Sequence, residues 1–119
     1  MAIVGAHVLL YTLEAEALRA TLRDVLGWQH VDAGDGWLIF RLPPAEIGVH
    51  PSEGETRHEL SLICDDVAAT AAELRAKGLE VHGEPRDLGF GIGTRLVLPG
   101  GVEVLLYEPR HETAIESSG

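Results

Sequence analysis

Two stretches of the chain show the same order of hydrophobic and polar positions, about 50 residues apart. In the first, an apolar run at 7–10 precedes an acidic residue and an amphipathic segment that ends at Gly27. In the second, an apolar run at 59–62 precedes an acidic residue and an amphipathic segment that ends at Gly78. A repeat of this length is typical of two copies of one supersecondary unit, neither of which can bury its sheet face alone.

The first copy is predicted to contain five elements. Leu18, Leu22 and Leu26 recur at helical spacing, and Gly27 stops the helix. A glycine-rich turn then joins two strands as a hairpin, and prolines end the strands that follow. The elements are a strand at 2–11, a helix at 14–26, strands at 28–31 and 37–42, and a short strand at 46–50.

The second copy repeats this order after a polar linker at 52–56. Asp66 is predicted to cap its helix and Gly78 to stop it. A proline-glycine turn joins its last two strands. The elements are a strand at 57–64, a helix at 67–77, a strand at 79–82, a glycine-rich loop at 83–93, and strands at 94–98 and 102–107.

Each copy is therefore predicted to form one βαβββ module, and the fold class is α+β. We expect a single domain over 1–119, with modules at 2–51 and 57–109 and a tail at 110–119. The modules would join their mixed sheets into one curved sheet, with the helices outside. The inner side would be a cleft that accepts a small-molecule ligand.

Charge and cysteine content exclude several classes of function. Nine Lys and Arg residues against nineteen Asp and Glu residues give a net charge of −10, so nucleic acid is not an expected partner. No apolar run approaches the length of about 18 residues that a membrane-spanning helix needs, so no membrane span is expected. Cys64 is the only cysteine, which excludes an internal disulfide and predicts a reducing cytoplasm.

Several short segments carry a resemblance to a known family. They are Gly5-Ala6-His7-Val8, Leu22-Arg23-Asp24-Val25-Leu26-Gly27-Trp28, Leu60-Ser61-Leu62-Ile63-Cys64-Asp65-Asp66, Leu74-Arg75-Ala76-Lys77-Gly78, Leu98-Pro99-Gly100-Gly101 and Leu106-Tyr107-Glu108-Pro109. Together they resemble the vicinal oxygen chelate superfamily of glyoxalase, bleomycin resistance and dioxygenase-like proteins. The resemblance covers residues 3–109. It implies the two-module fold, a homodimer and, in the active members, a divalent metal in the cleft.

The resemblance also implies metal ligands on the first and last strands of each module. A strict transfer of these positions gives His7, Gly48, Glu59 and Leu105, of which only two can bind a metal. A shift of two residues on the terminal strands gives an alternative set with two imidazoles and two carboxylates, which suits Zn, Ni, Fe or Mn. That set is His7, His50, Glu59 and Glu103. One carboxylate, Glu59 or Glu103, would then act as the catalytic base.

Other side chains are candidates for direct contact with the ligand. Aromatic rings can stack on a flat molecule, and an arginine can bind an anionic group. The candidates are Trp37, Phe40, Phe90 and Arg95. Phe90 lies in the glycine-rich segment, which is predicted to form a flap over the cleft.

Each candidate also has a purely structural interpretation, as a core ring, a solvated strand end or a hairpin rim. Two functions therefore stay open. One is a glyoxalase/bleomycin resistance/dioxygenase-like protein that binds a small molecule beside a degenerate metal site. The other is a metal-dependent lyase, isomerase or dioxygenase that acts on vicinal oxygens. The residues do not decide whether the protein is an enzyme, and they establish no certain cofactor.

Overall fold

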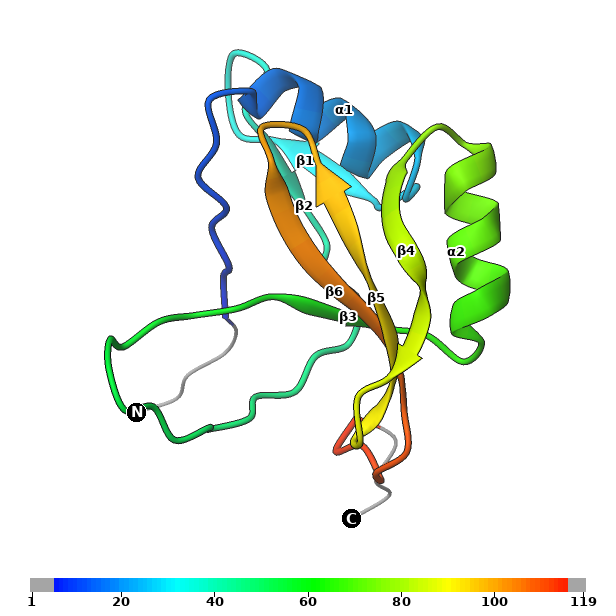
Figure 1. Cartoon of the computed structure of the whole chain (residues 1–119). Coiled ribbons are helices and arrows are strands. Elements are labelled where there is room, and N and C mark those ends of the chain that lie inside the picture. The colour runs from blue at the N-terminus through cyan, green and yellow to red at the C-terminus, as the bar shows by residue number, and fades with distance from the viewer. Residues whose placement is uncertain (1–5, 116–119) are drawn as a thin grey trace.

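A computed structural model describes residues 6–115 of the chain (Figure 1). The arrangement within this range is α+β, and each of two helices is followed by three strands. The elements, in chain order, are α1 (Ala15–Asp24), β1 (His30–Asp32), β2 (Leu38–Phe40), β3 (Ser61–Ile63), α2 (Val67–Ala76), β4 (Glu80–Asp87), β5 (Gly91–Leu98) and β6 (Val102–Pro109).

The larger sheet is mixed and has the strand order β3-β6-β5-β4. β5 and β6 are antiparallel along their whole length, from the pair Gly91–Pro109 to the pair Leu98–Val102. β4 pairs antiparallel with β5, and β3 pairs parallel with β6. The second half of the chain thus follows the predicted order of strand, helix and three strands.

The turn between β5 and β6 needs two glycines. Gly100 and Gly101 have φ angles of 87° and 77°, in the left-handed region that favours glycine. A side chain at Gly100 would also collide with the Thr12 hydroxyl, which donates a hydrogen bond to the Pro99 carbonyl at 3.2 Å. The segment that leads into α1 is therefore held against the tip of this hairpin.

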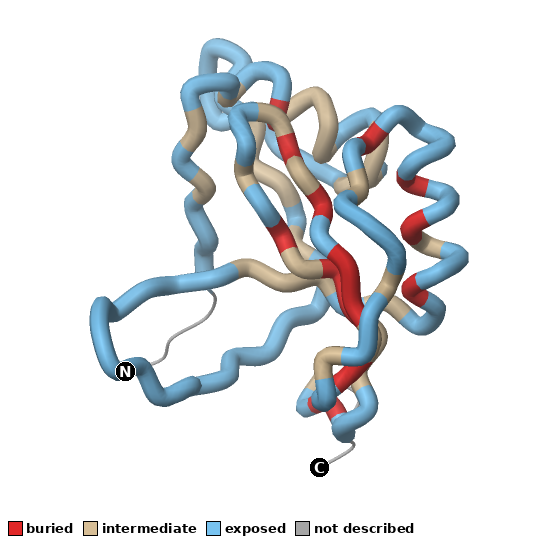
Figure 2. The backbone as a smooth tube through the Cα atoms, viewed as in Figure 1, coloured by how far each residue is buried: buried red, intermediate tan, exposed pale blue. Residues whose placement is uncertain are grey.

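The core lies on one face of the larger sheet. Leu96 on β5 is 0% exposed, and it packs with Val104 on β6 and with Val67 and Leu74 on α2. Leu18 on α1 joins the same cluster. Figure 2 shows these buried positions along β5, β6 and the side of α2 that faces them. Both helices therefore pack on the same face of the sheet.

The helices end where the sequence predicts. Asp66 accepts a hydrogen bond from the Ala69 amide at 3.0 Å, which caps α2. Gly27 and Gly78, with φ angles of 69° and 89°, follow α1 and α2. The predicted hairpin in the first half also forms, because β1 and β2 pair antiparallel from His30–Phe40 to Asp32–Leu38. None of the helices within residues 6–115 is long and apolar enough to cross a membrane.

Two predicted strands are wrong. Residues 6–11 and 46–50 are outside all strands of the described structure, and positions 2–5 of the first prediction lie outside the described residues. Most apolar side chains of these segments face solvent, with Ile47 and Val49 at 93% and 94% exposure, whereas Leu10 is half-buried against the core. Figure 2 shows both segments as an exposed tube that extends from the packed part of the molecule. A strand needs a hydrogen-bonded neighbour, and within the described chain neither segment has one.

The predicted glycine-rich loop at 83–93 is also wrong over most of its length. β4 extends to Asp87 and β5 begins at Gly91, so only residues 88–90 form the connection. Gly93 lies inside β5, where an added Cβ would come within 2.7 Å of the Leu88 side chain and 3.1 Å of Tyr107 Cβ. This glycine therefore permits close packing within a strand and does not mark a loop.

Candidate ligand-binding site

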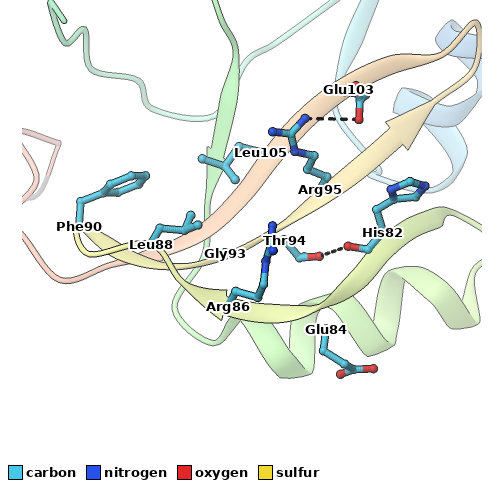
Figure 3. A pocket seen from close by; sticks show the side chains of 10 residues that line it. All are labelled: His82, Glu84, Arg86, Leu88, Phe90, Gly93, Thr94, Arg95, Glu103 and Leu105. Atoms are coloured by element: carbon cyan, nitrogen blue, oxygen red, sulfur yellow. Dashed lines mark hydrogen bonds and ion pairs between the residues drawn. The ribbon is translucent and has the colours of Figure 1, made fainter.

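A hollow of about 540 Å³ lies on the face of the larger sheet opposite the core (Figure 3). Successive side chains of a strand point to opposite faces. Because Leu96 and Val104 point into the core, their neighbours Arg95 and Leu105 point to the hollow. The lining residues are His82, Glu84, Arg86, Leu88, Phe90, Gly93, Thr94, Arg95, Glu103 and Leu105.

An irregularity in β4 brings two basic side chains to this face. His82 pairs with Arg95 and Arg86 pairs with Gly93, so the chain advances four residues on β4 and two on β5. The additional residues form a β-bulge. Because this excess is an even number, His82 and Arg86 both share the face of Arg95 and Gly93. Figure 3 shows Arg86 extending from β4 across the adjacent strand, on the same side as Arg95.

The bulge is held in place by side chains from two directions. The Thr94 hydroxyl donates to the His82 carbonyl at 2.8 Å. On the helix side, the Arg75 guanidinium of α2 donates to the Gly83 carbonyl at 2.7 Å. Gly83 itself has a φ of 76°, which a residue with a side chain adopts at a cost. The position of Arg86 is therefore fixed by specific contacts of the bulge.

The charges around the hollow are unevenly paired. Glu103 lies 3.5 Å from Arg95, and Glu84 lies 3.9 Å from Arg75 of α2. Figure 3 shows Glu84 pointing away from the group that Arg86 and Arg95 form. Within residues 6–115, no carboxylate forms an ion pair with Arg86. One guanidinium on the rim of the hollow is therefore free to bind an added anion.

The other end of the hollow is apolar. Leu88, Phe90 and Leu105 gather there (Figure 3). The Phe90 ring meets the Tyr107 ring edge-on, with centroids 5.4 Å apart. Burial raises the pKa of Tyr107, and the negative charge of Glu46 adds to this effect. The phenol therefore stays neutral at physiological pH, next to the apolar wall.

An ion pair fixes the turn that carries Leu88 and Phe90. Asp87 accepts from the Arg110 guanidinium at 2.7 Å and from the Gly89 amide at 2.8 Å. The Arg110 amide donates to the Phe90 carbonyl at 2.9 Å. The hydrogen bond from Arg110 is the main cause of a lowered pKa for Asp87, and the bond from Gly89 adds to it. The turn is thus fastened to the segment after β6.

Two of the four predicted ligand contacts lie at the hollow. Phe90 and Arg95 line it, whereas Trp37 and Phe40 do not. Trp37 is 57% exposed, and the Arg19 guanidinium carbon lies 4.9 Å from its ring centroid. Phe40 packs against His30, with ring centroids 5.3 Å apart.

The four predicted metal ligands are not brought together. His7 and His50 are exposed, and His50 Nδ1 lies 2.7 Å from the carbonyl of the next residue. Glu59 is exposed beside Arg57 at 3.4 Å, and Glu103 pairs with Arg95 in the hollow. The described part of the chain contains no group of three or more His, Cys, Asp or Glu side chains that could hold a metal ion. As arranged in one chain, the donor set does not fit a metal.

Cys64 packs against the core on the opposite side of the sheet. Burial raises the pKa of its thiol, so the reactive thiolate is disfavoured.

Sequence reasoning missed His82, Arg86 and Leu88. The signal for these residues was the alternation of side chains along a strand, which continues past His82. The prediction of a loop at 83–93 ended the strand too early to use it. Arg86 lies four residues after His82 and shares its face, so a strand continued through this segment would have placed both side chains at the hollow.

Solved structures with a similar fold cover nearly the whole chain. The antibiotic-binding protein TnmS3 from Streptomyces sp. CB03234 has a TM-score of 0.67 at 22% identity, covering 92% of this chain and 98% of that one. Lactoylglutathione lyase from Agrobacterium tumefaciens has a TM-score of 0.63 at 18% identity, with 88% and 92% covered. A member of the glyoxalase/bleomycin resistance protein/dioxygenase superfamily from Sphaerobacter thermophilus DSM 20745 has a TM-score of 0.61 at 19% identity, with 91% and 98% covered.

The chain has the glyoxalase/bleomycin resistance/dioxygenase fold. The predicted family resemblance is confirmed at the level of the fold. No protein-family model and no curated protein sequence matches the chain.

The Asp87–Arg110 pair gives a pH prediction. We expect the pKa of Asp87 to lie below the ordinary aspartate value of about 3.9, and Arg110→Gln to raise it toward that value. Because the folded-state pKa is lowered, the contribution of the pair to stability is present above the ordinary value. It is lost as the pH falls through the folded-state pKa. Carboxyl-carbon NMR titration measures both values.

The matched control for this titration is Arg23→Gln, which removes the arginine of another exposed pair, Arg23–Asp24, at 2.7 Å. It should leave the pKa of Asp87 unchanged. An Asp87 that titrates identically with and without Arg110 would contradict the proposed fastening of the turn.

Proposed function

We propose that this protein binds a small organic molecule in the hollow between β4, β5 and β6, and that its metal site is degenerate. The observation that carries the proposal is the hollow itself, with apolar and cationic side chains on the sheet face opposite the two described helices. Its volume of about 540 Å³ is within the range of small-molecule sites, about 300–1,000 Å³. The similar protein TnmS3 is described as antibiotic-binding, which supports binding as the function.

The contacts follow from the lining of the hollow. Leu88, Phe90 and Leu105 would cover the apolar body of the ligand. Arg95 would contact its polar edge while it keeps Glu103 as a partner. The Asp87–Arg110 pair would hold the Phe90 turn beside the bound molecule. In this proposal Trp37 and Phe40 contact ligand only if another copy of the chain brings them to the hollow.

A homodimer is the second part of the proposal. The first half of the chain supplies α1, β1 and β2, and its extended segments at 6–11 and 46–50 expose apolar side chains, among them Val8, Ile47 and Val49. Exposed apolar patches of this kind are typical of interaction surfaces. We infer that these segments become the outer strands of a first βαβββ module when a second copy pairs with them. The chain would then contain two tandem modules, at 2–51 and 57–109.

A metal-dependent lyase, isomerase or dioxygenase remains the alternative. The similar structure of a lactoylglutathione lyase favours keeping it. Glu103 already lies in the hollow, and His7, His50 and Glu59 are on exposed segments that association could move toward it. This route requires an assembled donor set, and we derive no chemical step from it. The single cysteine supports a reducing cytoplasm as the location.

Filling the hollow should abolish binding. Leu105→Trp places a large ring on the inner face without changing the core face of β6. We expect it to weaken, by at least about tenfold, the binding of any small aromatic compound that the wild type binds, since a tenfold change needs only about 1.4 kcal/mol. A thermal-shift panel followed by titration calorimetry measures the effect. The matched control is Leu13→Trp at a fully exposed position. Equal affinity of wild type and Leu105→Trp would contradict the proposed site.

Charges on the exposed apolar segment should prevent dimerisation. We expect the wild type to have the mass of two chains by light scattering, and the double variant Ile47→Asp, Val49→Asp to have the mass of one. Burial of a carboxylate in an apolar interface is strongly unfavourable. Ser52→Asp, which adds charge in the same exposed stretch, is the control and should remain dimeric. A wild type that is monomeric at every concentration would refute this part of the proposal.

Metal analysis distinguishes binding from metal chemistry. We expect protein purified without chelator to carry well under one divalent ion per chain, with no change in His7→Ala. Elemental analysis by plasma mass spectrometry gives this ratio. An equimolar ion that disappears in His7→Ala would replace the binding proposal with the metal-dependent alternative.

A further inference from the structure

The ligand of the hollow can be narrowed by the chemistry of its rim, and this step rests on the proposed function. We propose that the hollow selects a flat aromatic carboxylate, whose acid group binds Arg86 and whose ring lies against Leu88 and Phe90.

The cationic end of the hollow points to an anion. The net charge of the chain is −10, so the protein as a whole repels anions and only a local cation can hold one. Arg95 has Glu103 at 3.5 Å, and the carboxylate of Glu84 is drawn toward Arg75 on the helix side of the sheet. Arg86 is the lining arginine left without a carboxylate partner among the described residues.

The geometry of Arg86 favours a carboxylate in particular. A guanidinium offers parallel N–H donors that match the two oxygens of a carboxylate. The β4 bulge, held by Thr94 and Arg75, fixes the backbone from which Arg86 extends toward β5. The backbone contacts of the bulge therefore set the point on the rim from which the guanidinium can reach a ligand.

An apolar wall begins next to Arg86. Gly93 is the residue of β5 that pairs with Arg86, and the Leu88 side chain packs into the space that a side chain at Gly93 would need. Leu88 and Phe90 therefore form one wall beside the arginine, and the Asp87–Arg110 pair fastens their turn (Figure 3). A flat ring that lies against this wall could direct its acid group to Arg86.

The test compares a matched pair of probes, 2-naphthoate and the neutral 2-naphthamide, by titration calorimetry. We expect the wild type to bind the acid at least about tenfold more tightly than the amide, because only the acid can accept charge-assisted hydrogen bonds from the guanidinium. Arg86→Gln should remove this preference and leave the affinity for the amide unchanged. Arg86→Lys keeps the charge and loses the paired donors. Its preference for the acid over the amide should therefore lie between that of the wild type and that of Arg86→Gln.

The control is Arg41→Gln, at an exposed arginine outside the hollow, which should bind both probes as the wild type does. Failure of the acid to bind, equal binding of acid and amide, or an unchanged preference in Arg86→Gln would each overturn the inference. If the wild type bound the acid and the amide equally, and Leu105→Trp abolished the binding of both, the proposed small-molecule site would still stand. The two proposals therefore fail by different results.

Discussion

The pairing of β5 with β6 determines most of this structure. Their continuous antiparallel register sets two faces at once, because each residue that points into the core has neighbours that point the other way. Leu96 and Val104 anchor both helices on one side. Arg95, Glu103 and Leu105 are therefore presented together on the other side. A shift of one residue in this register would bury the charged side chains and expose the core.

The elements that sequence predicts well are those whose signals are local. The two helices carry their own apolar spacing and their own stop signals at Gly27 and Gly78, so their bounds agree with the prediction to within a few residues. The proline-glycine turn between β5 and β6 predicts their hairpin. In both cases the information lies within about a dozen neighbouring residues, and the structure confirms the elements.

The predictions that failed concern pairing over long distances. The apolar segments at 6–11 and 46–50 have the composition of strands, yet a strand exists only where another backbone pairs with it. Arg86 was missed for a related reason, since the glycines around it suggested a loop, and only the pairing of β4 with β5 shows that this segment is a strand. Phe90 and Arg95 were chosen by residue type and do line the hollow, whereas no local pattern showed that Trp37 lies elsewhere.

The bulge of β4 also affects how the sheet can grow. β4 is an edge strand, and an edge with regular free hydrogen-bonding groups recruits strands from other molecules into aggregates. The irregular step between His82 and Arg86 contains Pro85, which has no amide hydrogen to donate, and charged side chains flank it. This edge is therefore a poor template for an incoming strand. The residues that shape the hollow thus also prevent strands of other molecules from adding to the sheet along β4.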